Sequence, residues 1–287
     1  MFATEFSYYR AGSIAEANEL LVKHPGAKLL AGGHSLIPLM KLRLATPSVV
    51  VDIGRVAELR GIEAKGGIVR IGALTTHAQL AASAVLRREC PALAEAAAMI
   101  GDPAVRNRGT IGGNVAHADP ASDLPTVLVA VGARFGLTGP GGPRSVEAAQ
   151  FFLGLMTTAL GDQDVLTTIE VPAKRSGQGM AYAKFAHPAS RYAVIGVAAV
   201  LTTSGGVCSS ATVALGGLVP SPTRASAVEA ALARQPLNGD TMARAAAAVS
   251  KDLGGEVLGD LFASAEYRRA MAPVWVAQAL SVAAERG

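Results

Sequence analysis

The chain has 287 residues, of which 50% are hydrophobic and 17% charged, so it can bury sizeable cores and is not of the disordered class. Its net charge of +4 comes from scattered Lys and Arg residues, which predicts no nucleic-acid partner. The N-terminus lacks the apolar segment of a secretory signal, and no apolar run is long enough to span a bilayer. We therefore expect a cytoplasmic protein, and the length favours two domains.

The first 54 residues alternate between strand and helix patterns. Strands are expected at 6–10, 28–31 and 47–53. Helices are expected after a cap at Ser13, stopping before Pro25, and at 36–43. Ser13 and Glu16 have the spacing of a capping box, and Ser35 is a candidate N-cap. This β-α-β-α-β order predicts a small parallel α/β unit.

Residues 55–175 read as a mixed unit. Strands are expected at 59–62, 68–71, 133–138, 144–146 and 165–171, and helices at 78–82, 92–100 and 124–131. Thr75 and Thr76 are N-cap candidates for the first of these helices. The polar segment 174–179 is the expected domain boundary.

Three strands are expected after that boundary, at 179–186, 192–203 and 208–218, the last two joined by a hairpin turn at 204–206. Helices are expected at 223–233, 239–251 and 266–284. The second domain is therefore predicted to be a three-stranded antiparallel sheet with helices.

The chain has two cysteines, Cys90 and Cys208, far apart in the sequence and in no C-x-x-C motif. It therefore cannot by itself hold an iron–sulfur cluster or a cysteine-based zinc site, and no metal site is predicted. Reduced buried thiols are the expectation, and a disulfide between the two stays open.

The segment 106–125 suits neither an ordinary helix nor a strand, because it holds three glycines, two prolines and two asparagines. Its Gly112-Gly113 pair can take positive φ and lets another molecule approach the backbone closely. Backbone N–H groups pointing into one concavity would make a nest for an anion such as a diphosphate. Taken alone, the segment fits a Gly-rich surface loop equally well, since its spacing matches neither the dinucleotide fingerprint nor the P-loop.

A second Gly-Gly segment, Ala31-Gly-Gly-His-Ser35, follows directly on a short expected strand and precedes a helix. This order would place helix N-terminal amides beside the loop, ready for an anion. Two such segments could hold the two phosphates of one dinucleotide from opposite sides. For His34, a role of the backbone is favoured over one of the ring.

With both segments placed, 31–35 and 110–114 resemble the paired FAD-binding motifs of the medium subunit of molybdenum hydroxylases. This is the family of xanthine dehydrogenase and aerobic carbon monoxide dehydrogenase. The stretches 101–108, 117–123 and 182–184 resemble it too, and the likeness covers essentially the whole chain.

The resemblance implies an α+β protein whose FAD-binding domain is of the vanillyl-alcohol oxidase (PCMH) type and has two subdomains. That domain would cover 1–175, divided into 1–54 and 55–175, with a C-terminal flavoprotein domain at 178–287. FAD would lie in a cleft between the two subdomains and the C-terminal domain.

The resemblance also implies roles for single residues. Asp123 would hydrogen-bond the ribityl or ribose hydroxyls, Leu166 and Lys184 would contact the flavin ring region, and Tyr192 would cover one face of the ring. The alternatives are an Asx-turn for Asp123, a surface cation for Lys184 and a core aromatic for Tyr192. The candidate cofactor-binding set is Lys28, Leu29, Leu30, Ala31, Gly32, Gly33, His34, Ser35, Thr110, Ile111, Gly112, Gly113, Asn114, Asp123, Leu166, Lys184 and Tyr192.

By resemblance, the chain is the FAD-carrying electron-transfer subunit of a molybdenum hydroxylase. A large subunit would hold the molybdenum cofactor and a small one two [2Fe–2S] clusters, commonly as a dimer of heterotrimers. Electrons would leave to quinone, NAD or oxygen. The segment 185–192 departs from the basic segment and Gly-Asp-Tyr-Ala pattern of the carbon monoxide branch, which weakens carbon monoxide as the substrate. The alternatives are a stand-alone FAD oxidoreductase and a non-catalytic dinucleotide-binding protein.

Overall fold

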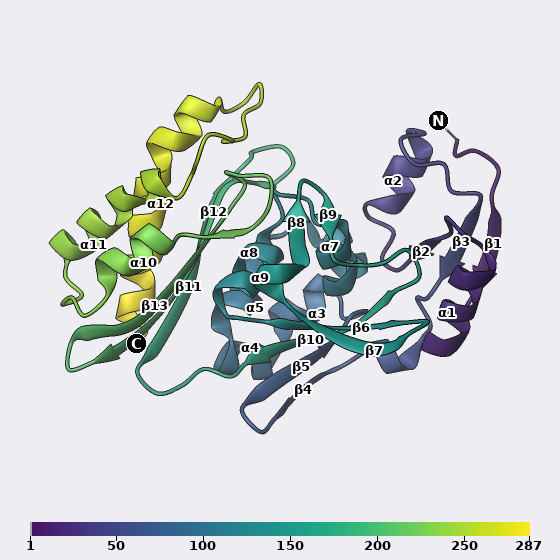
Figure 1. The fold of residues 1–287 in the computed structure, drawn as a ribbon, viewed down its shortest axis with the longest axis horizontal. Helices are drawn as coiled ribbons and strands as arrows, with labels where there is room; N and C mark the ends of the chain where they lie inside the picture. The colour runs from purple at the N-terminus through teal and green to yellow at the C-terminus, as the bar shows by residue number, and fades with distance from the viewer. Residues whose placement is uncertain (1) are drawn as a thin grey trace.

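A computed structural model describes residues 2–287 and shows the predicted α+β fold (Figure 1). Its elements lie in three consecutive parts of the chain. The N-terminal part is a parallel sheet of order β1-β3-β2 with two helices. Its elements are β1 (Ser7–Arg10), α1 (Ile14–Lys23), β2 (Lys28–Leu30), α2 (Leu36–Lys41) and β3 (Val49–Asp52). The predicted β-α-β-α-β unit is therefore confirmed.

Helix capping in this part differs in detail from the prediction. Ser13 accepts from the Glu16 N–H, but the Glu16 carboxylate reaches one residue further back and accepts from the Gly12 N–H at 2.7 Å. Ser35 caps nothing with its side chain, because its backbone is already helical (φ −112°, ψ −53°) rather than extended.

The middle part is a five-stranded antiparallel sheet of order β4-β5-β10-β6-β7, with short helices on one side and a small two-stranded hairpin. Its strands are β4 (Ile62–Lys65), β5 (Ile68–Gly72), β6 (Arg134–Gly139), β7 (Gly142–Glu147), β8 (Phe152–Gly154), β9 (Thr157–Thr158) and β10 (Val165–Pro172). Its helices are η1 (Ala57–Leu59), α3 (His77–Ala82), α4 (Ala84–Glu89), α5 (Pro91–Met99), α6 (Pro103–Arg108), α7 (Ile111–His117), α8 (Asp123–Ala130) and α9 (Ala148–Phe151).

One strand begins later than predicted, and short helices occur where the sequence predicts none. The strand expected at 59–62 begins at Ile62, because Leu59 ends a 3-10 turn and is buried in the N-terminal core. The helices α4 and α6 were not expected, although Ser83 and Asp102 cap them as ordinary N-caps. Thr76 confirms its prediction by forming a full capping box with Gln79 at the start of α3.

The C-terminal part is an antiparallel sheet of four strands rather than three, in the order β11-β12-β13-β14. Its elements are β11 (Gln178–Ala186), β12 (Ala193–Ser204), β13 (Val207–Gly216), β14 (Thr223–Arg224), α10 (Ser226–Leu232), α11 (Gly239–Ala247), η2 (Ala248–Lys251) and α12 (Ala265–Glu285). The helix expected at 223–233 starts at Ser226, because its first two residues pair with Leu215 and Ala214 as an edge strand.

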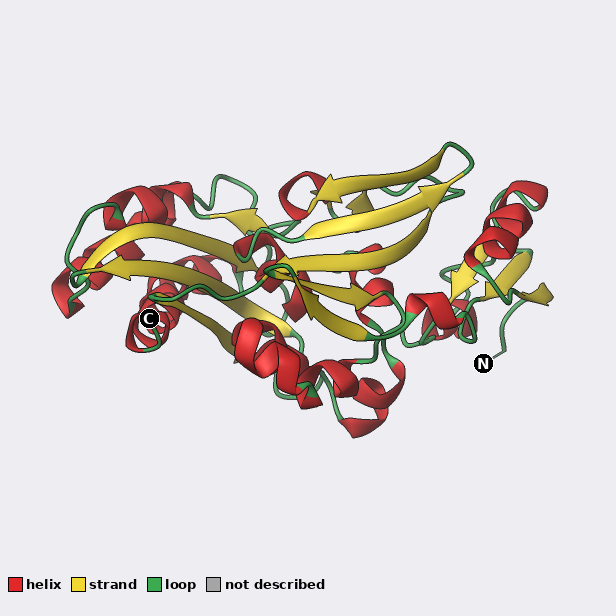
Figure 2. Ribbon diagram, turned by 90° about the horizontal axis from the view of Figure 1, so that it is seen from below, coloured by secondary structure: helices red, strands yellow, loops and turns green. Residues whose placement is uncertain are grey.

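The two faces of this sheet belong to different cores. Helices α10, α11 and α12 cover one face, and α5 and α8 of the middle part lie against the other (Figures 1 and 2). Glycines allow this close contact: a Cβ on Gly179 would collide with the Ala283 carbonyl of α12, and one on Gly216 with the Thr126 hydroxyl of α8. The C-terminal sheet is thereby fixed directly against the middle part.

Cys90 and Cys208 are both buried and unpaired, in two different cores, so the disulfide left open by the sequence does not form. Burial raises the pKa of the Cys90 thiol to about 12, which makes it an inert core residue. Within residues 2–287, no helix has the length and apolarity needed to cross a bilayer.

Candidate cofactor site

A cavity of about 760 Å³ runs between the three parts of the chain. That volume lies in the upper range of sites that bury a cofactor-sized ligand. Its lining includes most of the predicted cofactor-binding residues: Lys28, Leu29, Ala31, Gly32, Gly33, His34, Ser35, Thr110, Gly112, Gly113, Asn114, Asp123, Leu166 and Tyr192. The structure therefore brings residues from β2 and the segment after it, α7, α8, β10 and the turn before β12 to one site.

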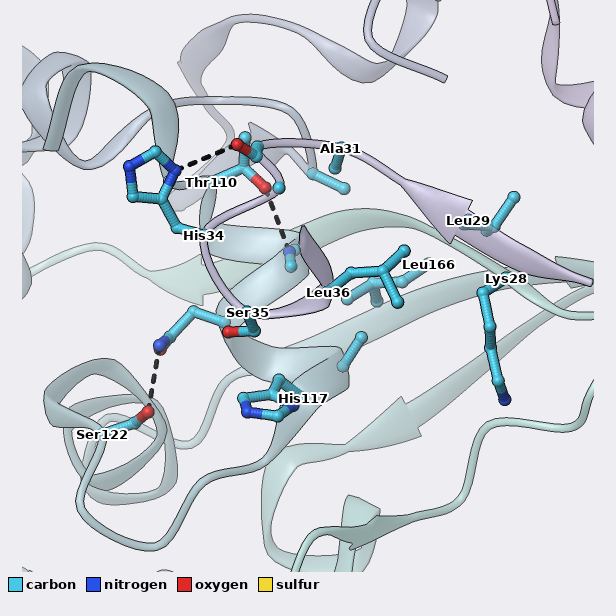
Figure 3. Close-up of a pocket in the computed structure, with 18 of the residues that line it drawn as sticks. Lys28, Leu29, Ala31, His34, Ser35, Leu36, Thr110, His117, Ser122 and Leu166 are labelled. Carbon is cyan, nitrogen blue, oxygen red and sulfur yellow. Dashed lines mark hydrogen bonds between the residues drawn. The ribbon is translucent and has the colours of Figure 1, made fainter. Parts of the chain in front are cut away.

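The two glycine segments come close together because each packs tightly against a neighbouring stretch of backbone. Gly32 faces the end of α6, and a Cβ at this position would collide with the Arg108 carbonyl. Gly112 lies against Ala73, the residue after β5, and a Cβ here would come within 2.7 Å of the Ala73 carbonyl oxygen. Figure 3 shows the 31–36 segment passing across the start of α7, with Thr110 beside it. Close packing, rather than positive φ, is the reason for glycine at these two positions.

The 110–117 segment is the first correction at the site. It is not an irregular loop: Thr110 is an N-cap, and residues from Ile111 to His117 form α7. Neither Gly112 nor Gly113 has positive φ. The Gly112 N–H donates to the Ala73 carbonyl at 2.9 Å and the Gly113 N–H to the Thr110 hydroxyl at 3.1 Å, so these amides do not form the predicted nest.

The free amides lie in the other segment. In the part of the chain that the structure describes, no protein acceptor receives the N–H groups of Gly32, Gly33, His34 and Ser35. Gly33 has a positive φ of 75°, which the tight turn between β2 and α2 requires and which glycine adopts without strain. His34 directs its Nδ1 back to the Gly32 carbonyl at 3.1 Å, and its ring lies beside Thr110 (Figure 3). The anion-binding capacity of the cavity is therefore concentrated in 32–35.

Two polar side chains of the cavity wall keep an atom without a partner among the described residues. Asn114 donates to Ser122 at 3.0 Å, as drawn in Figure 3, but its Oδ1 is buried and free. His77, at the start of α3, is buried with a free Nδ1. Its ring fits only because Gly109 opposite has no Cβ. Buried polar atoms without a partner are uncommon and point to a ligand.

His77 is also kept neutral. Burial, with the neighbouring charges of His34 and Arg106, lowers the pKa of His77 from 6.5 to about 4. A neutral imidazole can donate from one nitrogen and accept at the other, so it can serve either kind of ligand group. The sequence analysis missed this residue, because a lone histidine after a threonine cap carries no motif.

Asp123 and Lys184 form a buried ion pair at 2.8 Å, and the Tyr182 hydroxyl donates to the same carboxylate at 2.6 Å. Burial raises the pKa of Asp123, although Lys184 and Tyr182 act in the opposite direction. The Asx-turn alternative for Asp123 is wrong; Asp119 makes that contact, accepting from the Ala121 N–H. Asp123 lines the cavity while held from behind.

Lys184 is the second correction. Its side chain is 2% exposed and its ammonium is bound by Asp123 and by the Met99 carbonyl at 3.3 Å, so it is not among the residues lining the cavity. The surface-cation alternative is wrong as well. Beside Tyr192, the cavity is lined by a different cation, Arg191.

Tyr192 is 45% exposed, so it is not the core aromatic of the alternative interpretation. Leu166, from β10, lies on the cavity wall. Two other predicted residues lie elsewhere: Ile111 is fully buried in the middle core, and Leu30 faces a smaller cavity of about 340 Å³ on the other side of the 31–35 segment.

The sequence also missed residues at the far end of the cavity. There the wall is built by the N-terminal core and by the segment after β9, which contributes Asp162 and Asp164. Asp164 is held by the Gly161 N–H at 2.7 Å. These residues belong to no motif, and only the packing of α1 against β10 and β6 brings them to the site.

The donor set fits a dinucleotide. Free backbone amides suit a diphosphate, and apolar walls with a carboxylate that can accept from hydroxyls suit the nucleoside and flavin halves. Two buried polar atoms of the wall, Asn114 Oδ1 and His77 Nδ1, have no partner among the described residues. Residues 4–174 match the model of the FAD-binding domain in molybdopterin dehydrogenase, and residues 180–283 that of the CO dehydrogenase flavoprotein C-terminal domain.

The chain belongs to the FAD-binding medium subunits of the molybdenum hydroxylases. It is 42% identical to the carbon monoxide dehydrogenase medium chain of Hydrogenophaga pseudoflava over 284 residues, which are 99% of this chain and 98% of that one.

Solved structures of this family agree over the whole length. A carbon monoxide dehydrogenase from Hydrogenophaga pseudoflava, which lacks the Mo-pyranopterin moiety of its cofactor, superposes with a TM-score of 0.95 at 44% identity. That comparison covers 99% of this chain and 98% of the other. Quinoline 2-oxidoreductase from Pseudomonas putida 86 gives a TM-score of 0.94 at 32% identity and covers 99% of both chains. The predicted family, fold and FAD cofactor are thereby confirmed.

Proposed function

We propose that this chain is the electron-transfer subunit of a molybdenum hydroxylase complex. It receives electrons from [2Fe–2S] clusters of a small partner subunit and passes them to quinone, NAD or oxygen. A large subunit with the molybdenum cofactor carries out the oxidation, and the assembly is a dimer of heterotrimers. The supporting observation is the cavity that joins both glycine segments in a chain matching the FAD-binding domain.

Bound FAD supplies a centre that accepts an electron pair and releases it in one or two steps. The chain's own residues bind and orient it. The amides of 32–35 and the Ser35 hydroxyl hold the diphosphate, with Thr110, Gly113 and Asn114 on the opposite side. Asp123 accepts from hydroxyls of the cofactor, fixed by its ion pair with Lys184.

The other lining residues are assigned to the two halves of FAD by the part of the chain from which they come. Lys28 and Leu29 lie at the end formed by the N-terminal part, where the adenosine half fits. Tyr192, from the C-terminal part, covers the flavin half at the other end. Leu166 lines the cavity nearer the N-terminal part, because its neighbour Val165 packs in the N-terminal core. Lys184 acts on the flavin only through Asp123, because its ammonium does not reach the cavity wall.

The substrate belongs to the partner. Relatives with almost the same fold are named for oxidising substrates as different as carbon monoxide and quinoline, so this chain does not select the substrate. The complex is a carbon monoxide dehydrogenase or a dehydrogenase of xanthine, aldehyde or heterocycle type.

The test is to purify the protein from its native host and to record its visible spectrum and its subunit composition together. We expect a flavin spectrum with added iron–sulfur absorbance and two co-purifying chains. A single yellow chain that oxidises a substrate alone would replace the proposal by a stand-alone FAD oxidoreductase. A single colourless chain that does not take up added FAD would overturn it.

A further inference from the structure

The turn from His187 to Tyr192 joins β11 to β12 and carries three neighbouring residues of the cavity lining, Ser190, Arg191 and Tyr192. Its backbone is tightly closed: the His187 N–H donates to the Tyr192 carbonyl and the Arg191 N–H to the His187 carbonyl, both at 2.8 Å. Arg191 has a φ of 60°, which an arginine adopts only when the surroundings impose it.

The His187 side chain closes the turn from inside. Its Nδ1 accepts from the N–H groups of Ala189 at 3.2 Å and Ser190 at 3.3 Å. Because both groups are backbone donors, Nδ1 must carry no proton, so the imidazole is neutral with its hydrogen on Nε2. His187 itself does not line the cavity.

The ring of His187 packs against a second segment of the C-terminal part, the one before α12. Phe262 lies edge-on to it, with ring centroids 4.6 Å apart. Phe262 belongs to the segment before α12 that Asp260 organises, since the Asp260 carboxylate accepts from the Phe262 and Ala263 N–H groups at 2.8 Å. The far end of the turn is fixed by the Ala193 N–H, which donates to the Ala121 carbonyl at 3.0 Å.

We propose that His187 is a positioning residue for the cofactor site: its neutral imidazole holds the turn that presents Arg191 and Tyr192 to the flavin end of the cavity. This inference rests on the proposed function for the identity of the ligand, but the state of the turn is measurable without it. The positioned groups are one aromatic ring and one guanidinium, which suit a planar, electron-accepting ring system.

The test compares His187→Ala and His187→Asn in the protein purified from its host with its co-purifying chains. An asparagine can accept from the same two amides as an Asx-turn, so it is the matched rescue. The readouts are amide hydrogen exchange in the peptide covering 187–193, and flavin fluorescence.

We expect exchange at this peptide to be about tenfold faster in His187→Ala than in the wild type, with His187→Asn close to the wild type. The faster exchange in His187→Ala should be accompanied by a change in flavin fluorescence, which His187→Asn should not show. Equal protection and equal fluorescence in all three proteins would overturn the inference. If His187→Ala does not fold, His187→Asn still decides, because faster exchange in this variant than in the wild type would overturn the inference. A protein without flavin would contradict the proposed function and leave the exchange test intact.

Discussion

The carboxylate of Asp123 lies 2.8 Å from the ammonium of Lys184, and both side chains are at most 5% exposed. Asp123 starts α8 in the middle part, and Lys184 lies on β11 in the C-terminal part. The pair therefore joins two parts of the chain beneath the cavity wall, and Tyr182 completes it from the same strand. A buried pair of this kind is valuable mainly because losing one partner is costly.

Lys184→Met should destabilise the chain by about 3–5 kcal/mol, because it leaves a buried carboxylate with only a tyrosine hydroxyl as its partner. The double variant Asp123→Asn, Lys184→Met should recover most of that loss, since no charge remains buried. Urea unfolding of the isolated chain measures both. A single variant as stable as the wild type would show that the pair is not formed in solution.

Gly112→Ala and Gly113→Ala should separate folding from cofactor retention. A Cβ at Gly112 meets the Ala73 carbonyl oxygen at 2.7 Å, so Gly112→Ala should lower the melting temperature. A Cβ at Gly113 meets only the Thr110 hydroxyl, at 2.9 Å, and alanine favours the helix by up to about 1 kcal/mol. Gly113→Ala should therefore keep the fold. It should lose most of its FAD, because the added methyl group lies on the cavity wall that Gly113 lines.

The larger change Gly113→Val should abolish FAD retention. Its expected cause is the bulk that a valine places in the cavity, since φ at Gly113 is not positive and imposes no strain on another residue. Flavin-to-protein ratios after gel filtration measure this series. Full occupancy in Gly113→Val would contradict the assignment of this wall to the diphosphate.

His77 should give the fold a measurable pH dependence. Its pKa falls from 6.5 to about 4 in the folded chain, so the folded state prefers the neutral ring. The resulting stability is fully present above pH 6.5 and is lost as the pH falls towards 4, by about 3 kcal/mol in total. The difference in unfolding free energy between wild type and His77→Gln should shrink by this amount between pH 7 and 4. A difference independent of pH would mean that the ring is not buried as a neutral group.

Thr126→Val should stabilise the chain by about 1 kcal/mol. The Thr126 hydroxyl is fully buried between α8 and β13 and has no hydrogen-bond partner among the described residues. Valine keeps the shape of the side chain and removes the unsatisfied group. Thermal unfolding of the isolated chain measures the gain, and Thr126→Ser, which keeps the hydroxyl and loses a methyl group, is the control. A loss of stability in Thr126→Val would show that the hydroxyl has a partner in solution.

Local patterns in the sequence account for the regular elements. The parallel N-terminal unit, the long strands β10 to β13 and the helix α12 follow from alternating or helical apolar spacing. The edge strand β14 is harder to predict from the sequence. It pairs through only two residues, and its extended conformation depends on the partner strand β13. The glycines of the 110–117 segment predict a loop because glycine disfavours helix, whereas Thr110 as N-cap and close packing at Gly112 decide its structure.

The site could be located from the sequence but not built from it. The two glycine segments mark the place where the cavity forms, since both are required for close backbone approach. Which amides remain free depends on tertiary hydrogen bonds such as that from Gly112 to Ala73, which no local pattern reveals. The same holds for Lys184, whose position behind Asp123 follows from the packing of the C-terminal sheet on α8, and for His77 and Asp164.

The cavity walls come from all three parts of the chain, so a bound dinucleotide acts as a non-covalent cross-link between them. By mass action, free FAD at a hundred times its dissociation constant adds about 2.7 kcal/mol to the folded state. Among residues 2–287, few polar contacts outside the cavity hold the N-terminal part, such as those from Asn18 to the Thr138 and Gln163 carbonyls. A cell short of flavin would therefore accumulate chains whose N-terminal part opens first, and protease digestion at limiting riboflavin would begin there.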